Sequence, residues 1–257
     1  MKKVLIIPNL NDLGTCVQLA EQYNLGFEYN EFFSPKVLDD AAEQKKIINT
    51  YKSAQLPAYM TLHGAFFDVI PFSVDPKITE IATLRIEQSI TIAKDLGAKA
   101  VVFHTNYNPF LNTPSYIAGW VETNIAYWSK VLEAHPNMNI YLENMFDTTP
   151  DILEALSKGL CRYDNYGVAL DYAHASLSQT APIEWCKRLA AYIKHVHIND
   201  NDKKSDLHLA WGDGCLDREQ FYDCYNKYMQ GATVLIETSS IDNIKRSLEV
   251  FEKEGFL

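Results

Sequence analysis

The sequence predicts one (β/α)8 barrel, on three observations. Eight short runs rich in apolar and β-branched residues follow one another along the chain, and stretches of helical periodicity separate them. That alternation is the pattern of repeated β–α units on a parallel sheet. The 257 residues contain no Pro/Gly/Ser-rich linker, and a barrel of this kind commonly uses about 250 residues as one unit. We therefore expect a single TIM-barrel domain over residues 1–257.

The strands are predicted from apolar runs. Several of these runs are apolar at nearly every position, as expected for strands that are buried on both faces. In chain order, the predicted strands span residues 4–7, 26–29, 58–63, 100–104, 139–143, 167–171, 195–198 and 233–237.

The helices are predicted from apolar residues that recur every three or four positions. The clearest pattern covers 79–96, where Ile86 and Ile90 belong to a broad apolar stripe and Gly97 supplies a C-terminal stop. Shorter helical patterns occur at 151–156, 182–189, 220–225 and 243–251.

Composition and charge narrow the class of protein. A hydrophobic fraction of 47% and a charged fraction of 22% are typical of a soluble globular protein. The net charge of −10 disfavours nonspecific binding to nucleic acid or to an anionic membrane. No apolar run approaches the roughly 20 residues of a membrane span, so we expect no membrane partner.

The cysteines and the first residues indicate a cytoplasmic protein. The five cysteines form no C-x-x-C pair and are odd in number, which predicts reduced thiols and no disulfides. The apolar run at the N-terminus ends at Pro8, and no small-residue cleavage site follows, so we do not expect a secretory signal.

Histidine, aspartate or glutamate lies at the end, or one residue before the end, of six of the eight predicted strands. In a (β/α)8 barrel, the C-terminal ends of the strands carry the chemistry. Neutral imidazole and carboxylate are ligands that zinc and related divalent ions take in enzymes. The six side chains expected at one mouth of the barrel are His63, His104, Glu143, Asp171, His197 and Glu237.

Three further ligand-type residues lie in the loops after these strands. His174 follows the sixth strand, and Asp206 and His208 follow the seventh. Asp206 and His208 are two residues apart, so both side chains project from the same side of an extended segment. Gly212 and Gly214 let the backbone turn tightly beyond them. We expect these residues to join the same metal site.

Each of these residues could instead have a purely structural role. A lone histidine at the end of an apolar run is more often a hydrogen-bonded structural residue than a ligand. The structural alternative does not explain why five of the seven histidines fall at the predicted mouth. We expect His135 at a helix C-terminus on the surface, and His195 deeper in the barrel as a core or supporting residue.

Other residues of the same loops are candidates for supporting roles. Asn199 and Asp200 would orient the ligands, with an ordinary polar loop as the alternative. Lys203 and Lys204 are the main cations of the mouth, and we assign Lys203 to substrate binding. The aromatic residues expected to wall a substrate pocket, with loop anchoring as the alternative, are Phe66, Phe67, Tyr107, Tyr172 and Trp211.

The ligand-bearing stretches resemble a known family. Leu170-Asp-Tyr-Ala-His174, His197-Ile-Asn-Asp200 and Asp206-Leu-His208 with the later Gly-Asp-Gly are similar to motifs of the xylose isomerase-like TIM barrels. That family includes endonuclease IV and many sugar phosphate isomerases and epimerases. The resemblance covers nearly the whole chain and implies a divalent-metal active site at the barrel mouth.

Endonuclease IV holds a trinuclear zinc cluster with nine ligands, and all nine residue types occur here in the same order. By that resemblance, one ion would be held by His63, His104 and the bridging Glu143. The second ion would be held by Glu143, Asp171, His197 and Glu237. The third ion would be held by His174, Asp206 and His208.

The resemblance allows two kinds of chemistry. Close metal ions stabilise an attacking hydroxide and a departing oxyanion, which suits phosphoester hydrolysis. The isomerases and epimerases of the family instead resemble a subset of the ligands around one metal. In that subset a carboxylate moves a proton at the carbon next to a carbonyl, and the subset comprises Glu143, Asp171, His197 and Glu237.

The chain departs from the endonuclease IV pattern in its loops. Leu207 stands where endonuclease IV has an arginine, and residues 144–149 replace a glycine-rich loop. The loops at 105–119 and 172–182 contain no Lys or Arg. A duplex binder needs cations along its groove to meet phosphates. Nucleic acid is therefore the less favoured partner, and a small sugar phosphate-like molecule is the more favoured one.

The sequence supports three functional hypotheses, and two of them describe an enzyme. The leading hypothesis is an endonuclease IV-like phosphoester hydrolase with up to three zinc ions, with Glu143 holding the bridging geometry. The second is a sugar or sugar phosphate isomerase or epimerase that uses one Mn, Co or Mg ion, with Glu143 and Glu237 as metal ligands and candidate proton carriers. The third is a noncatalytic metal- or ligand-binding barrel, which the intact ligand set disfavours.

Overall fold

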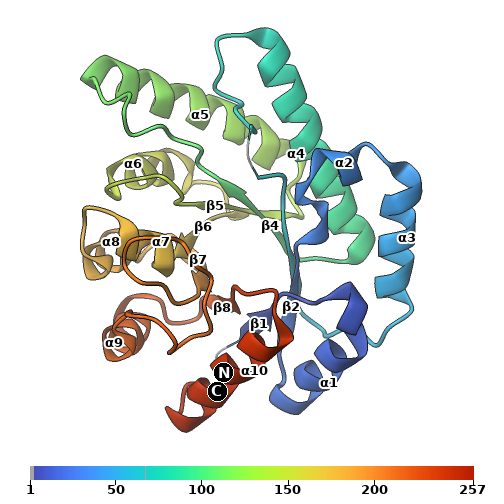
Figure 1. Cartoon of the computed structure of the whole chain (residues 1–257). Coiled ribbons are helices and arrows are strands. Elements are labelled where there is room, and N and C mark those ends of the chain that lie inside the picture. Colours follow the sequence, from blue (N-terminus) through green and yellow to red (C-terminus); the bar gives the residue numbers. More distant parts are fainter. Residues whose placement is uncertain (1–2, 67) are drawn as a thin grey trace.

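The fold is a closed barrel of eight parallel strands. The computed structural model describes residues 3–66 and 68–257. The strands are hydrogen-bonded in sequence order from β1 to β8, and β8 pairs with β1 to close the sheet. The strands lie at the centre and the helices form a ring around them (Figure 1). The predicted (β/α)8 fold is confirmed.

The observed strands lie close to the predicted ones. Their bounds are β1 Val4–Ile6, β2 Gly26–Tyr29, β3 Met60–His63, β4 Ala100–His104, β5 Asn139–Glu143, β6 Tyr166–Asp171, β7 Ile193–Ile198 and β8 Thr233–Ile236. Prediction and structure differ by at most two residues at any strand end. Glu237 lies one residue beyond β8, where its N–H still donates to the carbonyl of Ile198 at 2.8 Å.

The described residues form ten α-helices and two short 3₁₀ helices. The α-helices are α1 Leu13–Tyr23, α2 Pro35–Leu38, α3 Ala41–Lys52, α4 Pro76–Leu96, α5 Pro114–Ala134, α6 Asp151–Leu160, α7 Tyr172–Leu177, α8 Pro182–Leu189, α9 Arg218–Tyr228 and α10 Ile241–Lys253. The 3₁₀ helices are η1 Leu10–Asp12 and η2 Glu31–Phe33. Two α-helices, rather than one, follow β2 and likewise β6.

Helix α4 shows how local sequence fixes these elements. The side chain of Asp75 accepts a hydrogen bond from the N–H of Lys77, and Pro76 begins the helix. An N-cap carboxylate satisfies a free N–H group of the first turn, and proline suits that turn. At the other end, Gly97 takes the left-handed conformation with φ 74°, which glycine adopts without steric cost. The helix therefore begins and ends where its own residues dictate.

The strands place alternate side chains outside and inside the barrel. On β4, Val101 and Phe103 belong to the large core between sheet and helices, while Ala100 and Val102 form a separate small cluster. Successive side chains of a strand point to opposite faces. His104 therefore points inward with Ala100 and Val102. The same alternation brings the last inward residue of each strand to one end of the barrel.

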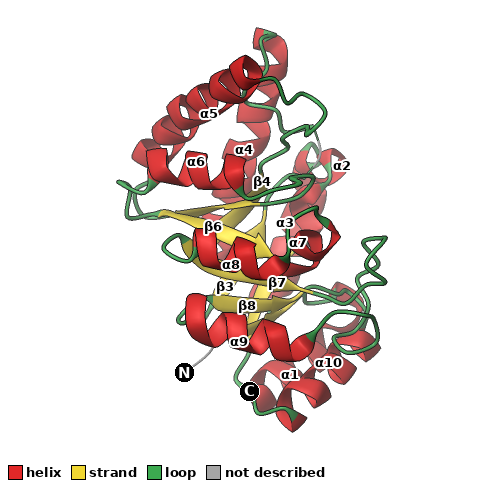
Figure 2. Cartoon of the chain, turned by 90° about the vertical axis from the view of Figure 1, so that its left-hand side faces the viewer, coloured by secondary structure: helices red, strands yellow, loops and turns green. Residues whose placement is uncertain are grey.

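The strand arrowheads in Figure 2 point toward the edge of the barrel where long connecting loops gather. This edge is the C-terminal mouth. None of the described helices combines the length and apolarity that a membrane span requires. All five cysteines are free thiols, as the sequence predicted.

Candidate metal centre

The six strand-end ligands meet inside the barrel mouth. His63, His104, Glu143, Asp171 and His197 are the last or near-last residues of β3 to β7, and Glu237 follows β8. All six are buried, although each is ionisable. Buried charges persist in proteins only when they are paired or bind a metal. The convergence predicted from the strand ends is therefore present.

Four of these side chains form the centre of the site. The Nδ1 atom of His197 lies 3.4 Å from Oε1 of Glu143 and 3.5 Å from Oε1 of Glu237. Glu143, Asp171 and His197 each offer a ligand atom within 4.8 Å of the other two. Three carboxylates and one imidazole thus face one small volume, which is a donor set suited to a divalent ion.

Two imidazoles extend the centre on the side of β3 and β4. The Nε2 atoms of His63 and His104 lie 3.3 Å and 3.6 Å from Oε2 of Glu143. His63, His104 and Glu143 form a second group whose ligand atoms lie within 4.8 Å of one another. Glu143 therefore directs one oxygen to this pair and the other to His197.

The three loop ligands lie at the opposite, more exposed side. Oδ2 of Asp206 lies 3.3 Å from Nε2 of His174 and 2.9 Å from Nε2 of His208. The Nδ1 atom of His174 also lies 3.2 Å from Oδ2 of Asp171, which joins this trio to the centre. The structure thus brings together all nine residues that the sequence predicted as ligands.

The buried polar atoms of the centre fit a cation. At the centre, seven buried ligand-type atoms have no hydrogen-bond partner among the described residues, namely Nε2 of His63, Nδ1 of His104, both carboxylate oxygens of Glu143, Oδ2 of Asp171 and both ring nitrogens of His197. Buried polar groups are normally hydrogen-bonded, so such a concentration requires an explanation. The oxygen and imidazole donors present would satisfy a divalent ion without rearrangement of the strands.

Backbone carbonyls fix the orientation of three histidine rings. The Nδ1 atoms of His63, His174 and His208 lie 3.2, 2.9 and 3.0 Å from the carbonyl oxygens of residues 64, 144 and 237. A carbonyl only accepts, so each Nδ1 must carry the proton. In the neutral ring the lone pair is then on Nε2, which faces a carboxylate in all three cases. This tautomer is the one that metal-ligating histidines use.

Burial and charge shift the pKa values of these ligands. Burial lowers the pKa of His104 to about 3, so its imidazole is neutral at physiological pH. Burial alone would raise the pKa of Glu237, but the charge of His197 outweighs burial and holds that pKa at about 2. Burial raises the pKa of Asp171 well above its usual value. Neutral imidazole and ionised carboxylate are the forms that bind metals, so a metal at Asp171 would displace the proton that its raised pKa favours.

Glu28, on β2, also belongs to the site, although the prediction from the last residues of the strands did not include it. Its Oε1 lies 3.1 Å from Nε2 of His197, and its Oε2 lies 3.1 Å from Nε2 of His195. Oε2 also accepts a hydrogen bond from the hydroxyl of Thr61 at 2.6 Å. Because Glu28 faces Nε2 of His197, a proton on that nitrogen would leave Nδ1 free for a cation. His195 is buried beneath the centre, as expected for a supporting residue.

We expect Glu28→Gln to weaken binding of a divalent ion roughly ten- to hundredfold, the usual effect of losing an outer partner of a metal-ligating histidine. Thr61→Val is the matched control, because it removes one hydrogen bond to Glu28 and leaves the carboxylate opposite His197. Titration of the metal-free proteins with Mn²⁺, followed by calorimetry, gives the two affinities. Equal affinity of the Gln variant and the unchanged protein would show that Glu28 supports the barrel and not the metal.

Asn199 and Asp200 have different roles. The amide of Asn199 lies 3.5 Å from both Nδ1 of His208 and Oε2 of Glu237, so Asn199 does border the ligands. The carboxylate of Asp200 instead accepts from the N–H groups of residues 201, 212 and 216. A side chain at Gly214 would collide with that carboxylate, and Gly212 has φ 100°. Asp200 therefore shapes the loop after β7 and does not orient an imidazole.

The predicted pocket residues divide into two groups. The ring of Phe66 lies 4.1 Å from that of His63, at the edge of the centre, and Tyr107 lines a pocket beside it. Phe67 lies outside the described residues. Tyr172 packs against Phe221 of α9 and is buried. The structure therefore favours the loop-anchoring alternative for Tyr172.

Trp211 and Lys203 also lie away from the ligands. Trp211 is buried and packs against Phe221 and Phe251, and its indole N–H donates to the hydroxyl of Tyr222. It anchors the loop after β7 against α9 and α10, which favours the loop-anchoring alternative for Trp211. Lys203 is exposed, with φ 60°, and remains a candidate contact for a substrate.

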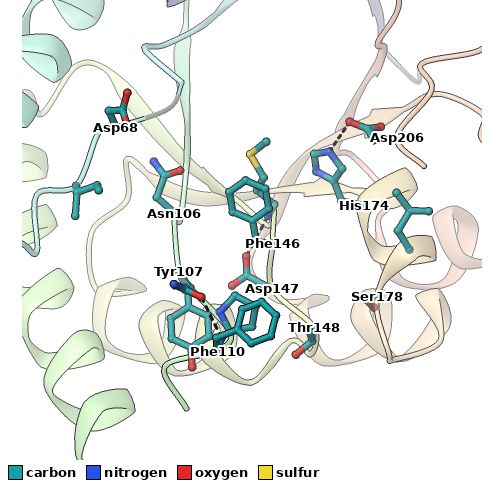
Figure 3. Close-up of a pocket in the computed structure, with 15 residues that line it drawn as sticks. Asp68, Asn106, Tyr107, Phe110, Phe146, Asp147, Thr148, His174, Ser178 and Asp206 are labelled. Carbon is teal, nitrogen blue, oxygen red and sulfur yellow. Dashed lines mark hydrogen bonds and ion pairs between the residues drawn. The ribbon is translucent and has the colours of Figure 1, made fainter. Parts of the chain in front are cut away.

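A pocket of about 660 Å³ adjoins the centre. Figure 3 shows His174 and Asp206 at one side of it and Tyr107, Phe110 and Phe146 gathered at another. The described residues that line it include no Lys or Arg. A volume of that size is typical of a site for a small organic ligand.

The fold and the site together define a (β/α)8 barrel with a candidate divalent-metal centre at its C-terminal mouth. Residues 18–254 match the family described as xylose isomerase-like TIM barrel. The chain belongs to this family. The resemblance seen in the sequence is thereby confirmed.

Several individual proteins are similar to this chain in sequence or in fold. A protein designated MJ1311, from Methanocaldococcus jannaschii, is 25% identical over 205 residues, which cover 76% of this chain and 69% of that protein. A D-tagatose 3-epimerase-like protein has a similar structure, with a TM-score of 0.76, 22% identity and coverage of 98% of this chain and 96% of that one. The TTHB071 protein from Thermus thermophilus, soaked with ZnCl₂, has a TM-score of 0.75 at 21% identity, with coverage of 98% and 97%. D-psicose 3-epimerase from Clostridium cellulolyticum has a TM-score of 0.71 at 12% identity, with coverage of 100% and 99%.

Proposed function

We propose that this protein is a sugar epimerase or isomerase that depends on one divalent ion. The observation that carries the proposal is the buried convergence of four donors, Glu143, Asp171, His197 and Glu237, beside a pocket whose described lining lacks Lys and Arg. Similar folds include proteins described as sugar epimerases. The phosphoester hydrolase that the sequence favoured becomes the second candidate, because the described lining of the pocket offers a phosphate no Lys or Arg.

The chain's own residues suit proton transfer beside a carbonyl. Glu143 ends β5 and Glu237 follows β8, so the two carboxylates approach the centre from different sides of the barrel. One carboxylate would remove the proton from the carbon next to the carbonyl, and the other, after taking a proton from solvent, would return that proton to the opposite face. The configuration of that carbon would then invert. The low pKa of Glu237 keeps its carboxylate ionised and able to accept the proton.

A divalent ion held by the four donors would polarise the carbonyl and so acidify the neighbouring C–H bond. His197 would be held in place by Glu28 from below. His63 and His104, at 3.3 and 3.6 Å from Glu143, would orient that carboxylate or contact substrate hydroxyls.

Deuterium exchange tests the proposal directly. The protein, loaded separately with Mn²⁺, Co²⁺, Mg²⁺ and Zn²⁺, is incubated in D₂O with ketohexoses, ketopentoses and ketose disaccharides. We expect deuterium at the carbon beside the carbonyl and the appearance of an epimer or isomer, both followed by NMR. Absence of exchange with every sugar and every metal would reject the proposal.

The hydrolase remains a second candidate because of one specific arrangement. Five ligand-type residues lie beyond the epimerase set, and three of them present Nε2 to a carboxylate with Nδ1 fixed by a backbone carbonyl. That arrangement suits a second and a third ion, at His63–His104–Glu143 and at His174–Asp206–His208. Close metal ions favour displacement at phosphorus.

Metal content separates the two candidates. Protein purified without chelator and without added metal is measured by elemental analysis. About one equivalent per chain, retained in the double variant His63→Ala/His104→Ala, fits the epimerase. Nearly three equivalents, mostly zinc, together with hydrolysis of model phosphodiesters that the double variant loses, would favour the hydrolase instead.

A further inference from the structure

The floor of the pocket beside the metal centre contains a buried carboxylate, that of Asp147. Asp147, four residues after β5, lines this pocket and is 4% exposed. Its Oδ2 accepts hydrogen bonds from the hydroxyl of Thr105 at 2.7 Å and from the N–H of Met145 at 3.0 Å. Its Oδ1 is buried and has no hydrogen-bond partner in residues 3–66 and 68–257. One half of the carboxylate is therefore fixed by the protein, and the other half lacks a donor.

An unpartnered buried carboxylate oxygen is costly, and it calls for a donor from outside the chain. Burial raises the pKa of Asp147 to about 6, so the carboxylate is largely ionised at neutral pH and acts only as an acceptor. The missing group is therefore a hydrogen-bond donor, such as a hydroxyl or an ammonium group of a ligand. A phosphate, which carries negative charge, is excluded by the same reasoning.

The walls around Asp147 are aromatic and apolar. Phe110 is 91% exposed and Phe146 is 51% exposed, which is uncommon for phenylalanine unless the surface has a function. Figure 3 shows both rings with Tyr107 beside Asp147. The hydroxyl of Tyr107 donates to the carbonyl of Leu111, so that ring is fixed. Aromatic faces bury the C–H face of a sugar ring, and a carboxylate accepts from its hydroxyls.

The pocket is continuous with the metal centre. His174 and Asp206 line the pocket, and the same two residues belong to the ligand set, with their side chains 3.3 Å apart. A molecule whose reacting carbons lie at Glu143 and Glu237 can therefore extend into the pocket. A volume of about 660 Å³ exceeds what the open chain of a single ketose needs.

We propose that this pocket binds a second sugar ring, so that the substrate is a ketose or keto sugar joined to a pyranose unit, with a hydroxyl or ammonium group of that ring donating to Asp147. The inference rests on the proposed epimerase and deepens it. Phe110, Phe146 and Tyr107 cover the apolar face of the ring, and the absence of Lys and Arg from the described lining disfavours phosphorylated sugars.

Equilibrium binding tests the inference without relying on turnover. The metal-loaded protein is titrated by calorimetry with fructose, with fructose 6-phosphate, and with three ketose disaccharides of different linkage: lactulose, turanose and isomaltulose. We expect at least one disaccharide to bind roughly tenfold more tightly than fructose, the effect of about one additional well-formed hydrogen bond to a charged group. Fructose 6-phosphate should bind no more tightly than fructose.

Asp147→Asn is the informative variant. Its amide oxygen can keep the bonds from Thr105 and Met145, while its NH₂ group replaces the free Oδ1 by a donor. The ratio of disaccharide affinity to fructose affinity should fall to about one. Asp95→Asn is the matched control, because it removes the same charge from an exposed position on α4 that does not line the pocket, and it should keep the ratio. An amino sugar disaccharide, tested in the same way, separates an ammonium donor from a hydroxyl donor.

The possible results distinguish this inference from the proposed function. If no disaccharide binds more tightly than fructose, or if the two variants lower the ratio equally, the second-ring site is overturned even if free ketoses are epimerised. If the preference depends on Asp147 while no sugar exchanges deuterium, the site stands and the proposed reaction fails.

Discussion

Glu237→Gln is expected to slow epimerisation roughly a thousandfold, within the range for loss of a general acid–base group. The amide has nearly the same shape as the carboxylate but cannot take a proton from carbon. Glu237 is 6% exposed and lies 3.5 Å from Nδ1 of His197, so no water or neighbouring carboxylate can easily replace it. The effect should fall on kcat at saturating Mn²⁺, where the weaker metal binding of the amide is compensated.

Deuterium exchange and epimer formation are measured together for this variant. Glu249→Gln is a suitable control, because Glu249 is an exposed glutamate on α10, remote from the centre. A rate for Glu237→Gln within tenfold of the unchanged protein would remove Glu237 from the proton-transfer step. Glu143 alone would then have to both remove and return the proton.

Saturation with Mn²⁺ is expected to raise Tm by roughly 10 °C above that of the chelator-treated protein. A ligand that binds only the folded state at a thousand times its Kd stabilises that state by about 4 kcal/mol. For a chain of this length, each kcal/mol raises Tm by roughly 2–4 °C. The physical source is the set of buried, unpartnered oxygen and nitrogen atoms of Glu143, Asp171 and His197, which a cation would satisfy.

Scanning calorimetry with and without metal checks this expectation. Asp171→Asn removes one donor of the centre and should reduce the shift to a few degrees. If the unchanged protein melts at the same temperature with chelator and with excess Mn²⁺, Co²⁺ or Zn²⁺, the centre binds no metal under these conditions. The unpartnered atoms would then have to be satisfied by protons and water.

The ligands were predictable because they belong to strands. A parallel barrel places all C-terminal strand ends at one mouth, and a period of two places their last inward residues on the inside. Four strands end on a residue whose side chain points into the barrel, namely His63, His104, Glu143 and Asp171. The positions of these residues therefore follow from the sequence alone. Asp206 and His208 were found from the two-residue spacing, although their contact with His174 could not be derived from it.

Glu28 was missed because β2 ends on an outward residue. Tyr29 is the last residue of β2, and its ring packs against Tyr51 of α3. Glu28 is thus the last inward position, one layer below His63, since it pairs in register with Thr61. A signal was present: a lone carboxylate between Phe27 and Tyr29 in an apolar strand needs a buried partner.

Loop residues were predicted less well. Trp211 and Tyr172 follow strands β7 and β6, as ligands do, but their side chains turn outward to α9 and α10. Asp147, in contrast, was not predicted as a site residue, yet it lies at the floor of the pocket. The direction of a loop side chain depends on caps and hydrogen bonds, such as those of Asp200, that no periodicity encodes.

The barrel, the order of its strands and the imidazole and carboxylate groups at the mouth could be predicted from residue patterns, because these features depend on short-range periodicity and on a closed parallel topology. The folded structure was needed to establish which oxygen of Glu143 faces which histidine, that Glu28 lies against His197, and that Asp147 lies beneath an aromatic pocket. Those relations depend on register between strands and on loop conformation, which join residues far apart in the chain.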